Sequence, residues 1–237
     1  MRAPRTPAEV LAQLLRSDPA RPRVTWYDDT PGPTAGERIE LSAKVLANWV
    51  NKAANALQDE FDVAPGSTVR LALPPHWRAL YWAMAVWSVG GCVSLDDADP
   101  DLTVTDDPDI AADATAAVLV TLPALARSAP GGTPAGVVDE ARELSTFGDQ
   151  FTAWEEPADG DPALRTAAGS TAYDAVVPQR DWPAGTRLHT RCGDLGQVLL
   201  DALAVWAADG SLVLSRGPVG DDGDRARLDA EGVTLER

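Results

Sequence analysis

The side chains most capable of chemistry are few in this chain and lie far apart in the sequence. Its 237 residues include two cysteines, Cys92 and Cys192, and two histidines, His76 and His189. Neither cysteine belongs to a Cys-x-x-Cys pair, and no predicted helix carries His, Asp or Glu at metal-ligand spacing, so no metal site is predicted. No nucleophile has a spaced His and Asp partner of the hydrolase type. Isolated histidines are most often structural, and we interpret His76 in that way.

Two acidic segments invite a metal-binding interpretation, and the spacing within them argues against it. The first, DDADPD, covers residues 96–101. Counted from Asp97, the sixth position of an EF-hand loop is Leu102 rather than Gly, and the twelfth is Pro108 rather than Glu. We therefore predict a solvated acidic loop. The second, DDGD at residues 221–224, is typical of a turn that begins a helix.

The charge balance excludes several classes of partner. The formal net charge is −16, and only Lys44 and Lys52 supply lysine. Such a surface repels nucleic-acid backbones and anionic lipid. No apolar run reaches the length of about 18 residues that a membrane span needs. The opening MRAPRTPAEV has no apolar segment of the signal-peptide kind, so a cytoplasmic protein without nucleic-acid or membrane partners is expected.

The hydrophobic pattern predicts an α/β fold with mostly parallel sheets flanked by helices. Residues 7–17 and the stretch that Ser42 caps have helical periodicity, and residues 76–89 are apolar nearly all round, as in a buried helix. Strands at 69–73 and 92–95 flank that buried helix, which makes a right-handed, parallel βαβ unit. Further elements are predicted as a hairpin from strands 24–27 and 37–41, strands at 117–122, 137–138, 187–188, 211–214 and 233–235, and helices beginning at 123, 195 and 221.

The composition divides the chain into three parts. Residues 1–154 are predicted to form a first α/β lobe, and residues 186–237 part of a second lobe. Residues 155–185 are rich in Pro, Gly, Asp and Ala in their first half, which is typical of a linker.

Several of these segments, in this order, resemble the adenylate-forming (AMP-binding, acyl-CoA synthetase-like) enzymes. The resemblance rests on the segments RVTWYDD (23–29), NKAANAL (51–57), VAPGSTV (63–69) with LALPPHW (71–77), the buried helix ending in VGG (89–91), LAVWAADGSLVLS (203–215) and LDAEGVTLE (228–236). Each motif alone is weak, and their shared order makes the resemblance. It implies that the chain is similar to the N-terminal lobes of such enzymes, in truncated and degenerate form.

The resemblance implies a phosphate-binding loop after DPAL (161–164), at TAAGSTAYDAV (166–176). In the family this loop is rich in Ser, Thr and Gly and ends in Pro-Lys-Gly, so that backbone N–H groups and a lysine hold the phosphates of ATP. Here Thr166, Gly169, Ser170 and Thr171 are candidate nucleotide-binding remnants, and Asp174 lies about where the lysine would be. The alternative is an exposed linker of small residues.

The resemblance also implies what this chain lacks for adenylation. The family's magnesium-binding Glu, ribose-contacting Asp, adenine-contacting segment and C-terminal domain with its catalytic Lys have no counterpart before residue 237. His189 lies a few residues before the position of the family's Pro-x-x-His element, and is a weak candidate for a pocket residue.

Unaided adenylation is therefore not expected, and no catalytic residue, metal or cofactor is predicted. The first hypothesis is a non-catalytic interaction or regulatory module, with a protein partner at a sheet edge left unpaired after residues 233–235. The alternative is a small-molecule protein that binds a nucleotide (ATP or AMP) or an acyl group, or a reduced enzyme that needs a partner.

Overall fold

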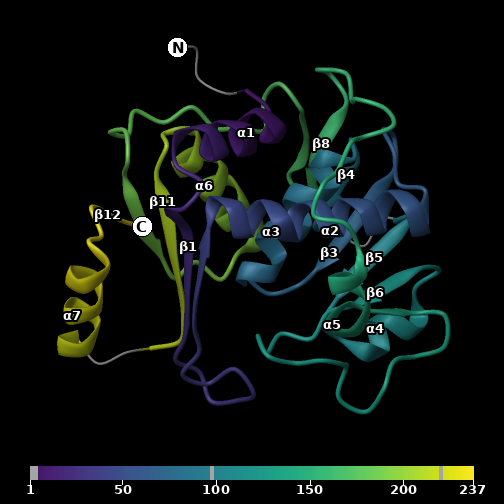
Figure 1. Cartoon of the computed structure of the whole chain (residues 1–237), viewed down its shortest axis with the longest axis horizontal. Coiled ribbons are helices and arrows are strands. Elements are labelled where there is room, and N and C mark those ends of the chain that lie inside the picture. Colours follow the sequence, from purple (N-terminus) through teal and green to yellow (C-terminus); the bar gives the residue numbers. More distant parts are fainter. Residues whose placement is uncertain (1–4, 97–98, 219–220) are drawn as a thin grey trace.

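Two mostly parallel β-sheets form the framework of the molecule (Figure 1). The structure is a computed structural model that describes residues 5–96, 99–218 and 221–237. Sheet A consists, in spatial order, of β12 (Leu235–Glu236), β10 (Arg187–Thr190), β11 (Ser211–Arg216), β1 (Pro22–Asp28) and β2 (Arg38–Ser42). Sheet B consists of β7 (Val138–Asp139), β6 (Ala117–Leu119), β5 (Leu102–Thr105), β3 (Thr68–Ala72), β4 (Cys92–Ser94), β8 (Pro162–Thr166) and β9 (Gly169–Ala172).

All neighbouring strands are parallel except two hairpin pairs, β1–β2 and β8–β9. The predicted α/β class with mostly parallel sheets is thus confirmed, as is the βαβ unit formed by β3, α3 and β4. The predicted hairpin between the first two strands is also confirmed.

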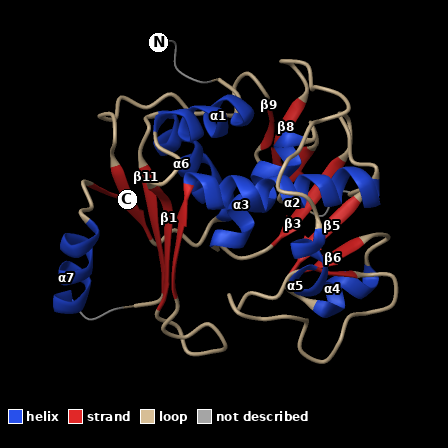
Figure 2. Ribbon diagram, viewed as in Figure 1, coloured by secondary structure: helices blue, strands red, loops and turns tan. Residues whose placement is uncertain are grey.

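Helices fill the space between the sheets and cover their outer faces (Figure 2). Four helices form the inner group: α1 (Pro7–Ser17), α2 (Ala43–Phe61), α3 (Trp77–Ser88) and α6 (Leu195–Ala207). Helices α2 and α3 lie between the two sheets, and α1 and α6 pack against this pair. The outer group is α4 (Pro108–Asp113), α5 (Glu140–Glu143), the 3-10 turn η1 (Leu144–Thr146) and α7 (Asp221–Glu231). No helix of the described ranges is long and apolar enough to cross a membrane.

The central helix α3 confirms the prediction of a helix that is buried on most sides. Each residue from Trp77 to Trp87 is buried, and α3 contacts β1 of sheet A as well as β3 and β4 of sheet B. Gly90 follows it with a φ of 84°, where a Cβ would lie 2.8 Å from the ring of Pro65. Glycine is therefore required there by both the backbone and the packing.

Local signals also set the starts of the first two helices. Thr6 caps α1 by accepting a hydrogen bond from the backbone N–H of Glu9, whose side chain accepts in return from the backbone N–H of Thr6. Ser42 caps α2 by accepting from the backbone N–H of Val45, as the sequence predicts.

Strand pairing does not follow the predicted three-part division of the chain. The first hairpin, β1–β2, belongs to the same sheet as the C-terminal strands, because β1 pairs with β11. The predicted linker, residues 155–185, contains the hairpin β8–β9, which extends sheet B through the pairing of β8 with β4. Parallel pairing between distant segments is a long-range choice, and composition along the chain does not report it.

Local differences from the predictions occur at residues 96–128. The strand β5 and the helix α4 were not predicted, although they contribute a central strand and its flanking helix. The predicted helix beginning at residue 123 is a series of turns. Within the predicted acidic loop 96–101, Asp97 and Ala98 lie outside the described residues.

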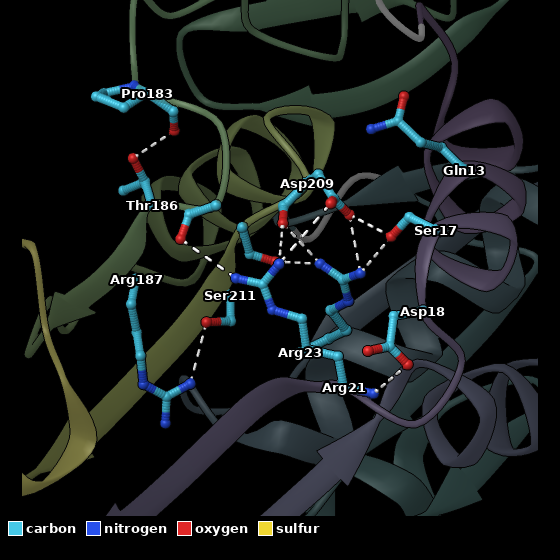
Figure 3. A network of polar contacts seen from close by, with 12 residues as sticks. Gln13, Ser17, Asp18, Arg21, Arg23, Pro183, Thr186, Arg187, Asp209 and Ser211 are labelled. Carbon is cyan, nitrogen blue, oxygen red and sulfur yellow. Dashed lines mark hydrogen bonds and ion pairs between the residues drawn. The ribbon is translucent and has the colours of Figure 1, made fainter.

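A buried arginine ties together the amino ends of the sheet A strands (Figure 3). The side chain of Arg23 is fully buried, and it donates hydrogen bonds to the backbone oxygens of Asp209 (2.7 Å) and Gly210 (3.1 Å) and to Ser17 Oγ (2.7 Å). It also pairs with the carboxylate of Asp209 at 2.8 Å. A Cβ on Gly210 would lie 2.2 Å from the backbone oxygen of Thr186, so this turn needs glycine. The network is a structural clamp at the edge opposite the strand carboxyl ends.

Candidate functional site

A cleft of about 980 Å³ opens at the carboxyl ends of strands from both sheets. In parallel sheets this edge is where ligand sites usually form. Strands β3, β4 and β8 end at the cleft, and the segment between β10 and α6 closes its other side. The walls are mostly aliphatic side chains and prolines, namely Leu71, Leu73, Pro74, Pro75, Leu95, Leu164, Leu195 and Leu200. The polar lining consists of Thr166, Cys192, Asp194 and Gln197.

The predicted phosphate-loop remnant lies partly at this cleft, but it has the geometry of a tight hairpin. Thr166 ends β8 and is paired with Gly169, the first residue of β9, so that only Ala167 and Ala168 form the turn. Thr166 Oγ1 accepts a hydrogen bond from the backbone N–H of Ala168 (3.2 Å). Thr166, Ala167 and Ala168 line the cleft. A two-residue turn is too short to wrap backbone N–H groups around a polyphosphate.

The other residues predicted for the phosphate loop do not form a phosphate-binding site at the cleft. Ser170 and Thr171 belong to the edge strand β9, and neither lines the cleft. Asp174, predicted at the position of the family's lysine, follows β9 and forms an exposed ion pair with Arg5 at 3.6 Å. The structure therefore brings Thr166 to the cleft and leaves the other three candidates outside it.

The N-terminus of α6 faces the cleft and is already occupied by its own cap. Asp194 Oδ1 accepts a hydrogen bond of 2.7 Å from the backbone N–H of Gln197. The backbone N–H of Asp194 is directed at Cys192 Sγ, 3.4 Å away. A helix N-terminus normally favours an anion, but a carboxylate cap at this position supplies that negative charge from the chain itself.

The charges that line the cleft do not suit a nucleoside triphosphate. None of the described residues that line it is Lys, Arg or His, and Asp194 adds a negative charge. Two like charges about 4 Å apart cost about 1 kcal/mol even in water. Across the described residues no group of three His, Cys, Asp or Glu side chains is arranged to hold a metal ion. The residues present thus do not fit a magnesium–polyphosphate group.

Both histidines are buried, and neither lines the cleft. His189 is on β10, where its Nε2 shares a hydrogen bond of 3.2 Å with Ser215 Oγ of the neighbouring strand, and burial lowers its pKa. It was predicted as a weak pocket candidate, and it does not line the cleft. His76 caps α3 by accepting at Nδ1 from the backbone N–H of Arg78 (3.2 Å).

The leucine walls are the part of the site that sequence reasoning missed. Leu71 and Leu73 lie at the end of one predicted strand, and Leu95 lies at the end of the next. The signal was available, because carboxyl ends of neighbouring parallel strands meet at one edge of a sheet. Leu164 and Leu200 could be added only once β8 and α6 were placed in space.

Comparison with solved structures finds the same fold in larger enzymes. Acetoacetyl-CoA synthetase from Streptomyces lividans superposes with a TM-score of 0.75 at 17% identity, covering 98% of this chain and 42% of its own. An acyl-CoA synthetase of Brucella canis gives 0.71 at 13% identity, covering 97% and 46%. A fatty acyl CoA synthetase of Mycobacterium tuberculosis gives 0.63 at 14%, covering 98% and 49%. The chain thus spans just under half the length of these three structures.

These likenesses establish the fold predicted from the sequence motifs. At 13–17% identity they show the architecture alone. No protein-family model matches the chain.

A curated relative gives a much closer sequence match. It is a "TIGR03089 family protein" of Mycobacterium tuberculosis (strain ATCC 25618 / H37Rv), 36% identical over 230 residues, and the match covers 88% of each chain. The aligned region therefore includes most of the length of both proteins. This chain therefore belongs to the TIGR03089 family and has the fold of acyl-CoA synthetases.

Proposed function

We propose that this chain is a non-catalytic binding or regulatory module built on the adenylate-forming fold. The observation that carries the proposal is the two-residue turn Ala167–Ala168 at the place where the related fold would hold a polyphosphate. Positioned cations and dipoles supply nearly all of the catalysis in phosphoryl-group chemistry. Among the described residues that line the cleft, Asp194 is the only charged one, so no lining cation is available to hold a polyphosphate.

The ligand class that fits the cleft best is an uncharged acyl chain. Its volume of about 980 Å³ is at the upper end of the usual range for small-molecule sites, and its walls are mainly leucine and proline. Each methylene buried against such walls stabilises a complex by about 0.8 kcal/mol. An eight-carbon chain could therefore bind without any help from a charge.

Calorimetric titration with a neutral, soluble octanoyl thioester tests this proposal. We expect the thioester to bind, and ATP and AMP to give no heat at millimolar concentration. Leu200→Asp, which places a charge on the cleft wall, should weaken binding at least about tenfold. Leu125→Asp is the matched control, because Leu125 is 93% exposed and does not line the cleft. ATP binding with no thioester binding would contradict the proposal, and equal effects of the two variants would place the thioester elsewhere.

Interaction with a protein partner is the second candidate for a non-catalytic module. Strand β12 lies at the edge of sheet A, and among the described strands it pairs with β10 alone, so its outer edge has no strand partner there. The same titration separates the two candidates. An interaction module of this kind gives no heat with the thioester, whereas an acyl-binding module does.

A further inference from the structure

A second cavity, of about 440 Å³, lies further along the same carboxyl edge. The loop between β1 and β2 forms one side of it, and the segments that follow β5 and β6 form the other. A hydrogen bond of 3.0 Å from the backbone N–H of Ala124 to Glu37 Oε1 joins the two sides. Most of the wall is apolar, with Pro31, Leu119 and Leu122 among the lining residues. No residue of this cavity belongs to the acyl cleft described above.

Arg216 supplies the single Lys, Arg or His side chain among the described residues lining the cavity. It is the last residue of β11 and pairs with the buried carboxylate of Asp28 at a long distance of 3.8 Å. That carboxylate is already held by Thr30 and Thr34, through hydrogen bonds from the Thr30 N–H (2.8 Å), Thr30 Oγ1 (2.5 Å) and Thr34 Oγ1 (2.6 Å). Within the described ranges the guanidinium of Arg216 donates no hydrogen bond, so its planar set of donors is available to a ligand carboxylate.

Asp106 places a carboxylate in the same cavity. It lies just after β5 and is half-buried, and burial raises its pKa while the nearby charge of Arg216 lowers it. Within the described part of the chain its carboxylate accepts a hydrogen bond only from its own backbone N–H. The cavity thus presents a carboxylate and a guanidinium of opposite charge, each with hydrogen-bonding capacity left for a ligand.

The charges select the ligand. Asp28 and Asp106 together outweigh Arg216, so a purely anionic ligand would be repelled. A purely cationic ligand would leave the guanidinium donors unused and would be repelled by Arg216. A zwitterion matches both groups, and an apolar substituent matches the walls.

We propose that this cavity binds an α-amino acid with an apolar side chain. The ligand carboxylate lies against the guanidinium of Arg216, and the ammonium group lies against the carboxylate of Asp106. The side chain packs against the leucine and proline walls beside Leu119 and Leu122. This proposal is independent of acyl binding in the cleft, because the two cavities share no lining residue.

Calorimetric titration with L-leucine and L-phenylalanine tests it, with 4-methylpentanoate and 3-methylbutylamine as analogues that lack the ammonium group and the carboxylate respectively. We expect at least one of the amino acids to bind and both analogues to bind at least about tenfold more weakly. No heat with either amino acid at millimolar concentration, or analogues that bind as well as leucine, would overturn the proposal.

Two substitutions and one control assign the contacts. Arg216→Gln and Asp106→Asn should each weaken binding of the amino acid at least about tenfold. Arg225→Gln changes the same charge at an exposed position of α7 outside the cavity, and should leave binding unchanged. Asp106→Asn is nearly isosteric at a half-buried site, so it tests the proposal even if Arg216→Gln destabilises the fold. Unchanged affinity in Asp106→Asn, with its melting temperature preserved, would contradict the assignment. Leu200→Asp should not affect amino-acid binding, which separates this proposal from the one for the cleft.

Discussion

The contribution of His76 to the stability of this protein is expected to be lost as the pH drops below about 6.5. Burial lowers the pKa of His76 from 6.5 to about 3, helped by the positive charges of Arg78 and Arg216 and opposed by Asp28. The unfolded chain therefore binds a proton at a pH where the folded chain does not. The stability is fully present above pH 6.5 and is lost progressively toward pH 3.

The size of this effect follows from the separation of the two pKa values. One pH unit corresponds to 1.36 kcal/mol, so about 2 kcal/mol should be lost by pH 5, and up to about 4–5 kcal/mol by pH 3. The side chain of His76 has no other way to relieve this cost, because its ring lies 4.7 Å from that of Trp26 and its Nε2 has no partner among the described residues.

The variant His76→Asn isolates the contribution of the histidine. Asparagine preserves an acceptor for the cap of α3 and does not titrate. Urea unfolding of both proteins at pH 8 and pH 5 gives the change in free energy of unfolding between the two conditions. From pH 8 to pH 5 the free energy of unfolding of the wild type should fall by about 2 kcal/mol relative to that of the variant. The same pH dependence in both proteins would show that His76 is not responsible.

Replacing Glu140 by alanine is expected to destabilise the protein by about 3–5 kcal/mol, because it leaves a buried arginine unpaired. The side chains of Glu140 and Arg78 are 0% and 4% exposed, and Arg78 Nη1 lies 3.0 Å from Glu140 Oε1. Tyr81 also donates to Glu140 Oε1. Arg78 further donates to the backbone oxygens of Leu122 (3.4 Å) and Pro123 (3.2 Å), so the pair fixes the turns after β6 to the start of α3.

Chemical denaturation at pH 8 measures this effect with two comparisons. At that pH the carboxyl group of Glu140 is mostly ionised, although burial raises its pKa to about 7. Glu143→Ala removes an exposed glutamate from the same short helix and should change the free energy of unfolding by about 0.5 kcal/mol or less. The double variant Arg78→Met, Glu140→Leu should recover much of the loss, since neither charge remains buried. A Glu140→Ala protein as stable as the wild type would show that the pair is not formed.

The raised pKa of Glu140 acts in the opposite direction to that of His76. A carboxyl group whose pKa is about 7 when folded and 4.5 when unfolded favours the folded state at the acid end of that interval, and this stability is lost as the pH rises through it. The two contributions are of opposite sign and similar size, so they nearly cancel between pH 4.5 and 6.5. For this reason the comparison of variants, and not the wild-type curve alone, assigns each contribution.

The helices α1, α2 and α3 could be predicted from the sequence because the signals that set them are local. The capping box at Thr6 and Glu9 and the cap at Ser42 begin α1 and α2 at the predicted residues. The apolar composition of residues 77–88 predicts the buried helix α3. Each of these depends on neighbours within one or two turns of helix.

The pairing of strands depends on distant segments, and the sequence did not reveal it. Strand β5 has four buried residues after an acidic loop, and a strand this short gives no periodic signal. The hairpin β8–β9 was interpreted as a loop or linker because its Gly, Ser, Thr and Ala residues are common in both kinds of segment. Its place at the edge of sheet B is fixed by the pairing of Val93 with Leu164, about seventy residues apart.

Of the residues that the sequence offered as site candidates, one lines the cleft and the others do not. The family resemblance directed attention to residues 166–171, and Thr166 does line the cleft. The two-residue turn between β8 and β9 could not be predicted, because its length is decided by where the strand pairing ends. The second cavity, with Arg216 and Asp106, joins four segments that are separated by up to 186 residues, and it has no sequence motif.

Pyrophosphate release by the purified protein is the most direct test of the central claim, which is that this cleft does not adenylate carboxylates. The protein would be incubated with ATP, magnesium, CoA and a panel of short, medium and branched carboxylic acids, and pyrophosphate would be followed by a coupled enzymatic assay. We predict a rate equal to that of the protein-free blank for every acid. Turnover at about 1 s⁻¹ or faster, in the usual range of enzymes, would contradict the account.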